Sequence, residues 1–134
     1  MYKQIGEITP QPLIERNQEG RQAMHTVRRQ LGEWLLMMGF QVVEVEYAGE
    51  NFRTTTFEPR LFRNLNGQHY TVHGPSCARL IELFEYVLTV RFSDWRDGEG
   101  SWGKFRWIVT DGNLNHTHCL RGRRKLSRTK PGWF

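Results

Sequence analysis

The chain has 134 residues, of which 38% are hydrophobic and 13% aromatic, and its formal net charge is +5. This length suits a single domain that buries a core without disulfide bonds, and its two cysteines give no disulfide framework. No apolar run approaches the roughly 20 residues that cross a bilayer, and the first residues lack the apolar segment of a signal peptide, so we expect a cytoplasmic protein without a membrane partner.

The first periodic segment runs from about Asn17 to Met38 and predicts an amphipathic helix. Its apolar residues recur at steps of three and four, and they are Met24, Val27, Leu31, Trp34, Leu35 and Met38. Gly39 is placed to end the helix. The polar side carries four residues that form either a solvated helix face or a second basic surface: Arg21, His25, Arg28 and Arg29.

The following segments predict strands of an antiparallel sheet. Alternating apolar residues over Gln41–Tyr47 are typical of a half-buried strand. Gly49-Glu50-Asn51 is expected to turn the chain into a second strand over Phe52–Phe57, and Pro59 belongs at an edge or a bend because it has no N–H to donate. Asn66-Gly67 favours a two-residue type I′ hairpin. One face of that hairpin should be buried: Leu61, Leu65, Tyr70 and Val72.

A second helix is expected to begin at Pro75-Ser76, with Ser76 as its N-cap. Its apolar face continues toward Phe92 and consists of Cys77, Leu80, Ile81, Phe84, Val87 and Leu88. Ser93–Gly103 is the longest stretch without periodicity, and loops of that length are either functional or mobile.

Asp111-Gly112 lies between two alternating runs, Lys104–Thr110 and Leu114–Arg121, and predicts a second hairpin. In a two-residue turn, even-numbered residues of the return strand share a face with odd-numbered residues of the outgoing strand. This parity places seven residues on one packed face: Phe105, Trp107, Val109, Leu114, His116, His118 and Leu120. Cys119 should then lie on the opposite face.

These elements predict one α+β domain over residues 1–121. In this domain an antiparallel sheet of five to six strands, built from hairpins, packs against two amphipathic helices. Residues 122–134 are expected to form a basic C-terminal tail whose composition is compatible with disorder.

The positive charge is concentrated after residue 120. All 14 acidic residues lie at or before Asp111, and they outnumber the 13 basic residues up to Leu120, whereas the rest of the chain carries +6. A cationic tail points to a polyanionic partner, because Lys and Arg that neutralise phosphates release condensed counterions. The residues expected to contact nucleic acid are Lys104, Arg106, Arg121, Arg123, Arg124, Lys125, Arg128 and Lys130. Four aromatic residues are expected to be exposed and to stack on bases: Trp95, Trp102, Trp133 and Phe134.

Four of the five histidines and both cysteines fall in two short runs, His69-x3-His73-x3-Cys77 and His116-x-His118-Cys119. A zinc site needs three or four converging ligands, and a regular sheet would scatter these residues, so we expect no metal and no cofactor. His69-Tyr70-Thr71-Val72 resembles half of the His-x-Thr/Ser signature of two-histidine phosphoesterases, which need two copies to supply a base and an acid. The second copy is missing, because His116-Thr117-His118 has a histidine where the hydroxyl should stand.

The sequence therefore favours a small non-enzymatic nucleic-acid-binding accessory protein, with DNA or RNA as its partner. Two alternatives stay open. One is a phage- or plasmid-type interaction protein that binds an acidic surface of a host protein complex and inhibits it. The other is a small metal-independent nuclease based on histidines.

Overall fold

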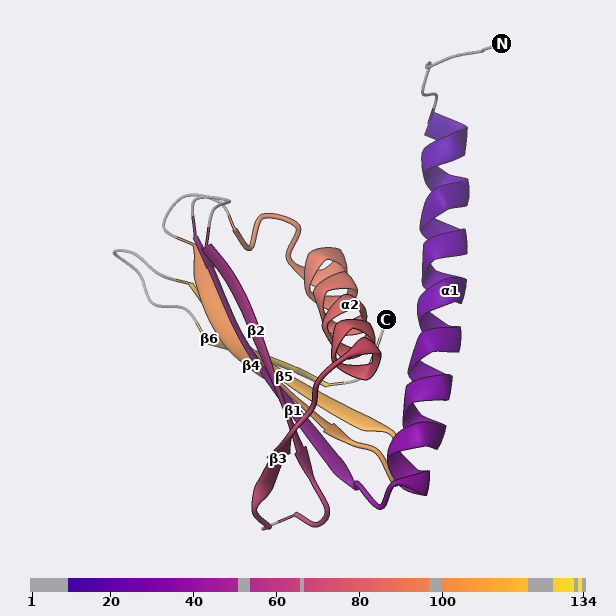
Figure 1. Cartoon of the computed structure of the whole chain (residues 1–134). Helices are drawn as coiled ribbons and strands as arrows, with labels where there is room; N and C mark the ends of the chain where they lie inside the picture. Colours follow the sequence, from indigo (N-terminus) through magenta and orange to yellow (C-terminus); the bar gives the residue numbers. More distant parts are fainter. Residues whose placement is uncertain are drawn as a thin grey trace.

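A computed structural model describes residues 10–50, 54–65, 67–96, 100–120, 127–131 and 133. The elements in chain order are α1 (Pro10–Met37), β1 (Val42–Glu50), β2 (Thr54–Phe62), β3 (His69–Thr71), α2 (Pro75–Arg91), β4 (Ser101–Ile108), β5 (Asn113–Leu120) and β6 (Ser127–Pro131). The strands form one 6-stranded antiparallel sheet in the order β3-β2-β1-β4-β5-β6. Both helices lie on the same side of this sheet (Figure 1), so the predicted α+β fold is confirmed.

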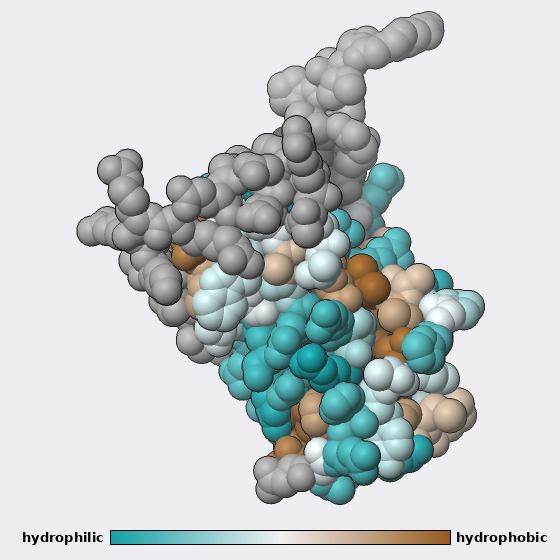
Figure 2. All heavy atoms as spheres, turned by 60° about the vertical axis from the view of Figure 1, so that its left-hand side comes forward, coloured by the Kyte–Doolittle hydropathy of each residue, from teal (hydrophilic) through white to brown (hydrophobic). Residues whose placement is uncertain are grey.

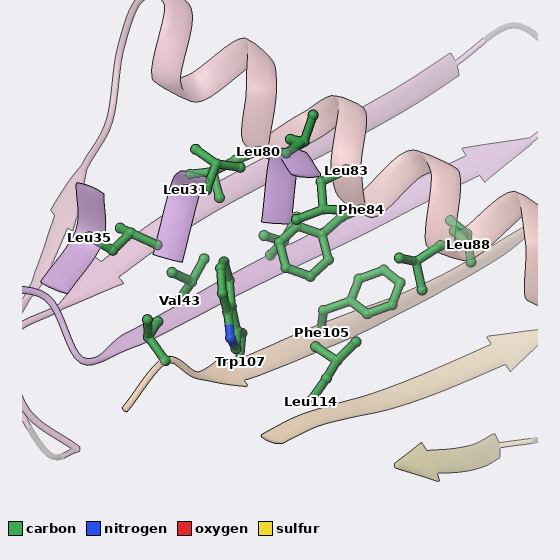
Figure 3. Packing of buried hydrophobic residues seen from close by; sticks show 14 of the residues in the cluster. Leu31, Leu35, Val43, Leu80, Leu83, Phe84, Leu88, Phe105, Trp107 and Leu114 are labelled. Atoms are coloured by element: carbon green, nitrogen blue, oxygen red, sulfur yellow. The ribbon is translucent and has the colours of Figure 1, made fainter. Parts of the chain in front are cut away.

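The core fills the space between the helices and the inner face of the sheet (Figure 3). Each helix contributes an apolar stripe at three- and four-residue spacing, and the strands contribute every second residue. Central members of this cluster are Leu31, Leu35, Val43, Leu80, Phe84, Phe105, Trp107 and Leu114. Burying one large apolar side chain stabilises a fold by about 1.5–3 kcal/mol, so this cluster is the main source of stability.

Both helices begin at a proline. α1 starts at Pro10 rather than near Asn17, and α2 starts at Pro75 with Gly74 as its N-cap. Proline is accommodated in the first turn of a helix because its missing N–H would have no partner there. The prediction of Ser76 as the N-cap is therefore wrong.

The connection between β1 and β2 lies later than predicted. Gly49 and Glu50 still pair with β2, opposite Thr55 and Thr54, and residues 51–53 lie outside the described residues. Gly49 is needed within the strand, because a Cβ there would meet the ring of Trp95. Pro59 lies in β2 just beyond the last pair with β3, Arg60↔Thr71, so no described strand covers its outer side and the predicted edge position is confirmed.

The predicted two-residue hairpin at Asn66-Gly67 is wrong in register. Leu61 pairs with Tyr70, not with Val72, so the connection spans residues 63–68. Arg63 leaves the strand to donate from Nη1 to the carbonyl oxygen of Met38 at 2.7 Å, and its guanidinium lies 5.1 Å from the ring centroid of Tyr70. The hydrogen bond to Met38 is a tertiary contact that the local turn preference does not include. Of the four residues expected to be buried, Leu61 is buried and Val72 is partly buried, whereas Leu65 and Tyr70 are exposed.

The β4–β5 hairpin keeps the predicted parity with a longer turn. Ile108 pairs with Asn113, so the connection has four residues, 109–112. Phe105 pairs with His116 and lies with it on the buried face, which confirms the parity. Leu120 is more exposed than expected because it ends β5 at the margin of the sheet.

Part of the predicted tail belongs to the sheet. β6 pairs with β5 from Cys119↔Ser127 to Asn115↔Pro131, and Trp133 packs against the core. Residues 122–126, 132 and 134 lie outside the described residues. Neither helix, over its described length, is both long and apolar enough to cross a membrane.

Candidate nucleic-acid interface

The two predicted contact residues on β4 share a carboxylate. Arg106 Nη1 donates to Glu44 Oε2 on β1, and Lys104 Nζ lies 3.8 Å from Glu44 Oε1. On the same face Arg60 pairs with Glu46 at 3.0 Å and with Glu58 at 3.4 Å. Figure 2, turned toward the sheet side of the molecule, shows a broad hydrophilic area. The ion pairs on this face combine both signs of charge, so Lys104 and Arg106 offer phosphates less positive charge than the sequence suggested.

The remaining predicted cations lie at or beyond the end of β5. Arg121, Arg123, Arg124 and Lys125 are outside the described residues, but they join Leu120 to Ser127 and so connect neighbouring ends of β5 and β6. Arg128 pairs with His118, and Lys130 pairs with His116. Leu120 and Ser127, the described residues that flank this arginine-rich segment, therefore lie on the two outermost strands at one edge of the sheet.

Trp133 anchors the chain after β6. Its Nε1 donates to the carbonyl oxygen of Gly112 at 3.0 Å, and its carbonyl oxygen accepts from Arg91 Nη2 at 3.0 Å. Its ring packs edge-on against Trp107 with centroids 5.1 Å apart. On the other side the guanidinium of Arg28 lies 4.9 Å from the Trp133 centroid. Trp133 is thus part of the core and does not offer a free face to a base, contrary to the prediction.

The second predicted basic surface, on α1, comes close to this anchor. Arg28 is half-buried by its contact with Trp133, whereas Arg21, His25 and Arg29 are exposed. Arg21 also lines a groove of about 470 Å³ between α1 and α2. The structure therefore brings α1 and the C-terminal segment together at Arg28, although they are far apart in the sequence.

Trp95 is not available for base stacking either. Its side chain is only 1% exposed, and its ring occupies the space that Gly49 leaves open on β1. A hydrogen bond connects the turn after α2 to the start of β4, because Ser101 Oγ donates to the carbonyl oxygen of Trp95 at 2.7 Å. Phe134 lies outside the described residues. Trp102, by contrast, is 46% exposed on β4, as predicted.

The two histidine pairs do not meet. β3 and β5 are separated by β2, β1 and β4, which places His69 roughly 19 Å from His116 at about 4.8 Å per strand. Within the described ranges, no three His, Cys, Asp or Glu side chains gather where they could hold a metal ion. An acid–base pair built from both histidine runs is therefore not assembled.

His116 and His118 instead form a buried polar cluster with Tyr47. The Tyr47 Oη lies 2.7 Å from His116 Nε2 and 2.6 Å from His118 Nδ1, and Arg91 Nη1 lies 3.1 Å from His116 Nδ1. His116 and His118 are only 1% and 2% exposed. Burial raises the pKa of the Tyr47 hydroxyl and lowers the pKa of the Arg91 guanidinium. The sequence identified neither Tyr47 nor Arg91, although two histidines on a buried face already imply polar partners there.

The contacts of this cluster determine which nitrogen of each histidine carries a proton. A guanidinium can only donate, so His116 Nδ1 accepts from Arg91, and the proton of a neutral His116 lies on Nε2. The His116 Nε2–H donates a hydrogen bond to Tyr47 Oη, and the Tyr47 hydroxyl donates to His118 Nδ1. The hydrogen bonds therefore run in one direction from Arg91 to His118.

We expect both buried histidines to be neutral Nε2–H tautomers at pH 7. Long-range ¹H–¹⁵N correlation spectra of the imidazole rings measure this directly. The exposed His69 provides the reference spectrum of a solvated ring. An Nδ1–H tautomer for His116 would contradict the assigned proton order.

Comparison with protein-family models, curated proteins and solved structures gave no match.

Proposed function

We propose that the protein binds nucleic acid through phosphate contacts of its arginine-rich C-terminal segment and does not catalyse a reaction. The observation that supports this proposal is that the described residues on both sides of residues 121–126 belong to the folded domain. β6 pairs with β5, and Trp133 is fixed by Gly112, Arg91 and Arg28. Cations held on a folded surface lose less conformational freedom on binding than cations on a free tail.

Charge compensation elsewhere supports the same location. On the open face of the sheet, three carboxylates pair with three cations. No acidic residue follows Asp111 in the sequence, so all charged side chains after Leu120 are cations. Phosphates should therefore favour the β5–β6 edge over the centre of the sheet.

The burial of His116 and His118 weakens the case for a nuclease. A general acid or base must come within hydrogen-bond reach of the substrate, and these two side chains are 1% and 2% exposed. Three of their four ring nitrogens already bond to Tyr47 or Arg91. They are better explained as part of the core than as catalytic groups.

Salt dependence tests the proposal. If four to six phosphates are contacted, a plot of log affinity against log salt should have a slope of roughly −3 to −5. Fluorescence anisotropy with random-sequence DNA and RNA, single- and double-stranded, measures this slope. Absence of binding at low salt would contradict the proposal and would favour an acidic protein surface as the partner.

A further inference from the structure

The open face of the sheet carries a hollow of about 370 Å³ that the phosphate contacts do not use. Its lining residues come from three neighbouring strands and are Glu46, Tyr47, Trp102, Gly103, Lys104 and Thr117. The volume lies near the lower end of the ~300–1,000 Å³ that is typical of small-ligand sites. It therefore suits a group of the size of one nucleoside.

Trp102 gives this hollow an aromatic wall. The residue is 46% exposed, and no other described ring packs against it. Three of the other described tryptophans are engaged in ring contacts: Trp95 packs against Tyr47, and Trp107 and Trp133 pack against each other. An exposed ring on an open antiparallel sheet is the arrangement on which unpaired bases stack.

Polar groups surround the aromatic wall. Glu46 and Lys104 flank the hollow, and their side chains are 47% and 46% exposed. Thr117 adds a hydroxyl from β5. A carboxylate, an ammonium and a hydroxyl offer both acceptors and donors to the edge of a base.

The hollow also lies close to the described residues that flank the arginine-rich segment. Trp102 pairs with Cys119, and Cys119 pairs with Ser127. Leu120 and Ser127, which flank residues 121–126 in the sequence, therefore lie within about two strand spacings of Trp102, or roughly 10 Å. A chain of nucleotides whose phosphates meet these cations would bring its bases to Trp102.

We infer that the hollow binds one unpaired nucleobase of a single-stranded nucleic acid, stacked on the indole of Trp102. The inference rests on the proposed function, because the arginine-rich segment supplies the contacts to the neighbouring phosphates. A base within a duplex is stacked and paired and cannot enter the hollow. The protein should therefore distinguish single strands from duplexes at Trp102.

The test compares Trp102→Ala with two control variants of the full chain, Trp102→Phe and Tyr70→Ala. Tyr70 is a suitable control because it is 43% exposed on β3, at the other edge of the sheet. The probes are labelled random 12-mers of single-stranded DNA and RNA and the corresponding duplex, at one low salt concentration. Thermal melting of each variant checks that the fold is retained.

Trp102→Ala should lower the affinity for single strands about tenfold, the effect of losing one stacked base. Its effect on duplex binding should be less than about twofold, Trp102→Phe should retain most of the affinity, and Tyr70→Ala should bind normally. If Trp102→Ala binds single strands unchanged while replacement of Arg123 and Arg124 with glutamine lowers binding, the base site is overturned. The proposed function would still hold in that case. If the arginine variants also bind normally, the proposed function fails as well. A mononucleotide that binds as tightly as the 12-mer would overturn the assignment to a single strand.

Discussion

Replacing all six cations after Leu120 with glutamine should abolish binding to random nucleic acid at moderate salt. The substituted residues are Arg121, Arg123, Arg124, Lys125, Arg128 and Lys130. Each cation that neutralises a phosphate contributes to the released counterions, so their joint loss should reduce the affinity at least ~100-fold and bring the salt slope close to zero. Glutamine keeps the backbone N–H and C=O groups with which β6 pairs to β5. The melting temperature should therefore stay within a few degrees of the wild-type value.

Two matched double variants show whether the affinity depends on where the cations lie or only on the net charge. Arg123→Gln with Arg124→Gln removes two cations from the proposed surface, whereas Arg60→Gln with Arg79→Gln removes two from elsewhere. Arg60 pairs with Glu46, and Arg79 bonds to Gln30 on α1. We expect the first variant to lose at least ~10-fold in affinity and the second less than ~2-fold. Equal losses would mean that net charge alone drives binding, and normal binding by the six-residue variant would move the search to the basic surface of α1.

Gly103→Ala should destabilise the fold by about 3 kcal/mol or more. A Cβ at this position would overlap the carbonyl oxygen of Thr117 and the hydroxyl of Tyr47. The carbonyl belongs to the neighbouring strand, and the hydroxyl is held by His116 and His118. Relief of the overlap therefore has to separate β4 from β5 or break buried hydrogen bonds.

Gly20→Ala is the matched control for this substitution. Gly20 lies in α1, and a Cβ there would make an ordinary contact of 3.6 Å with the Tyr86 ring. Alanine in a helix interior is favoured over glycine by about 0.5–1 kcal/mol. Denaturant unfolding followed by circular dichroism should show a gain in stability for Gly20→Ala and a loss for Gly103→Ala. A loss below about 1 kcal/mol for Gly103→Ala would contradict the tight packing of the buried cluster.

Alternation and periodicity predicted the parts of the fold that depend on the core. The faces of β4 and β5 follow from the two-residue repeat, which holds for turns of two or four residues alike. The register of the β2–β3 hairpin was mispredicted because Arg63 donates to the carbonyl oxygen of Met38, a residue that lies far from the turn in the sequence. Local sequence carries no information about such contacts.

The candidate site was less accessible to sequence reasoning. Trp95 and Trp133 looked exposed because they lie outside any periodic run, yet each fills a space prepared by a distant residue, Gly49 in one case and Arg28 with Trp107 in the other. β6 was also missed, because a short cationic segment with a proline has the composition of a free tail. Its pairing with β5 becomes visible only in three dimensions.

Arg91 gives the cluster around Tyr47 a second role. One of its N–H groups bonds to His116 and another to the carbonyl oxygen of Trp133. Docking of the C-terminal segment and the tautomer of a buried histidine therefore share one side chain, and two equilibria that share a group influence each other reciprocally. Any event that pulls residue 133 away breaks the Arg91 bond to the Trp133 carbonyl oxygen and alters the field at the Tyr47 hydroxyl. The NMR resonance of that hydroxyl should therefore report whether residue 133 is docked on the domain.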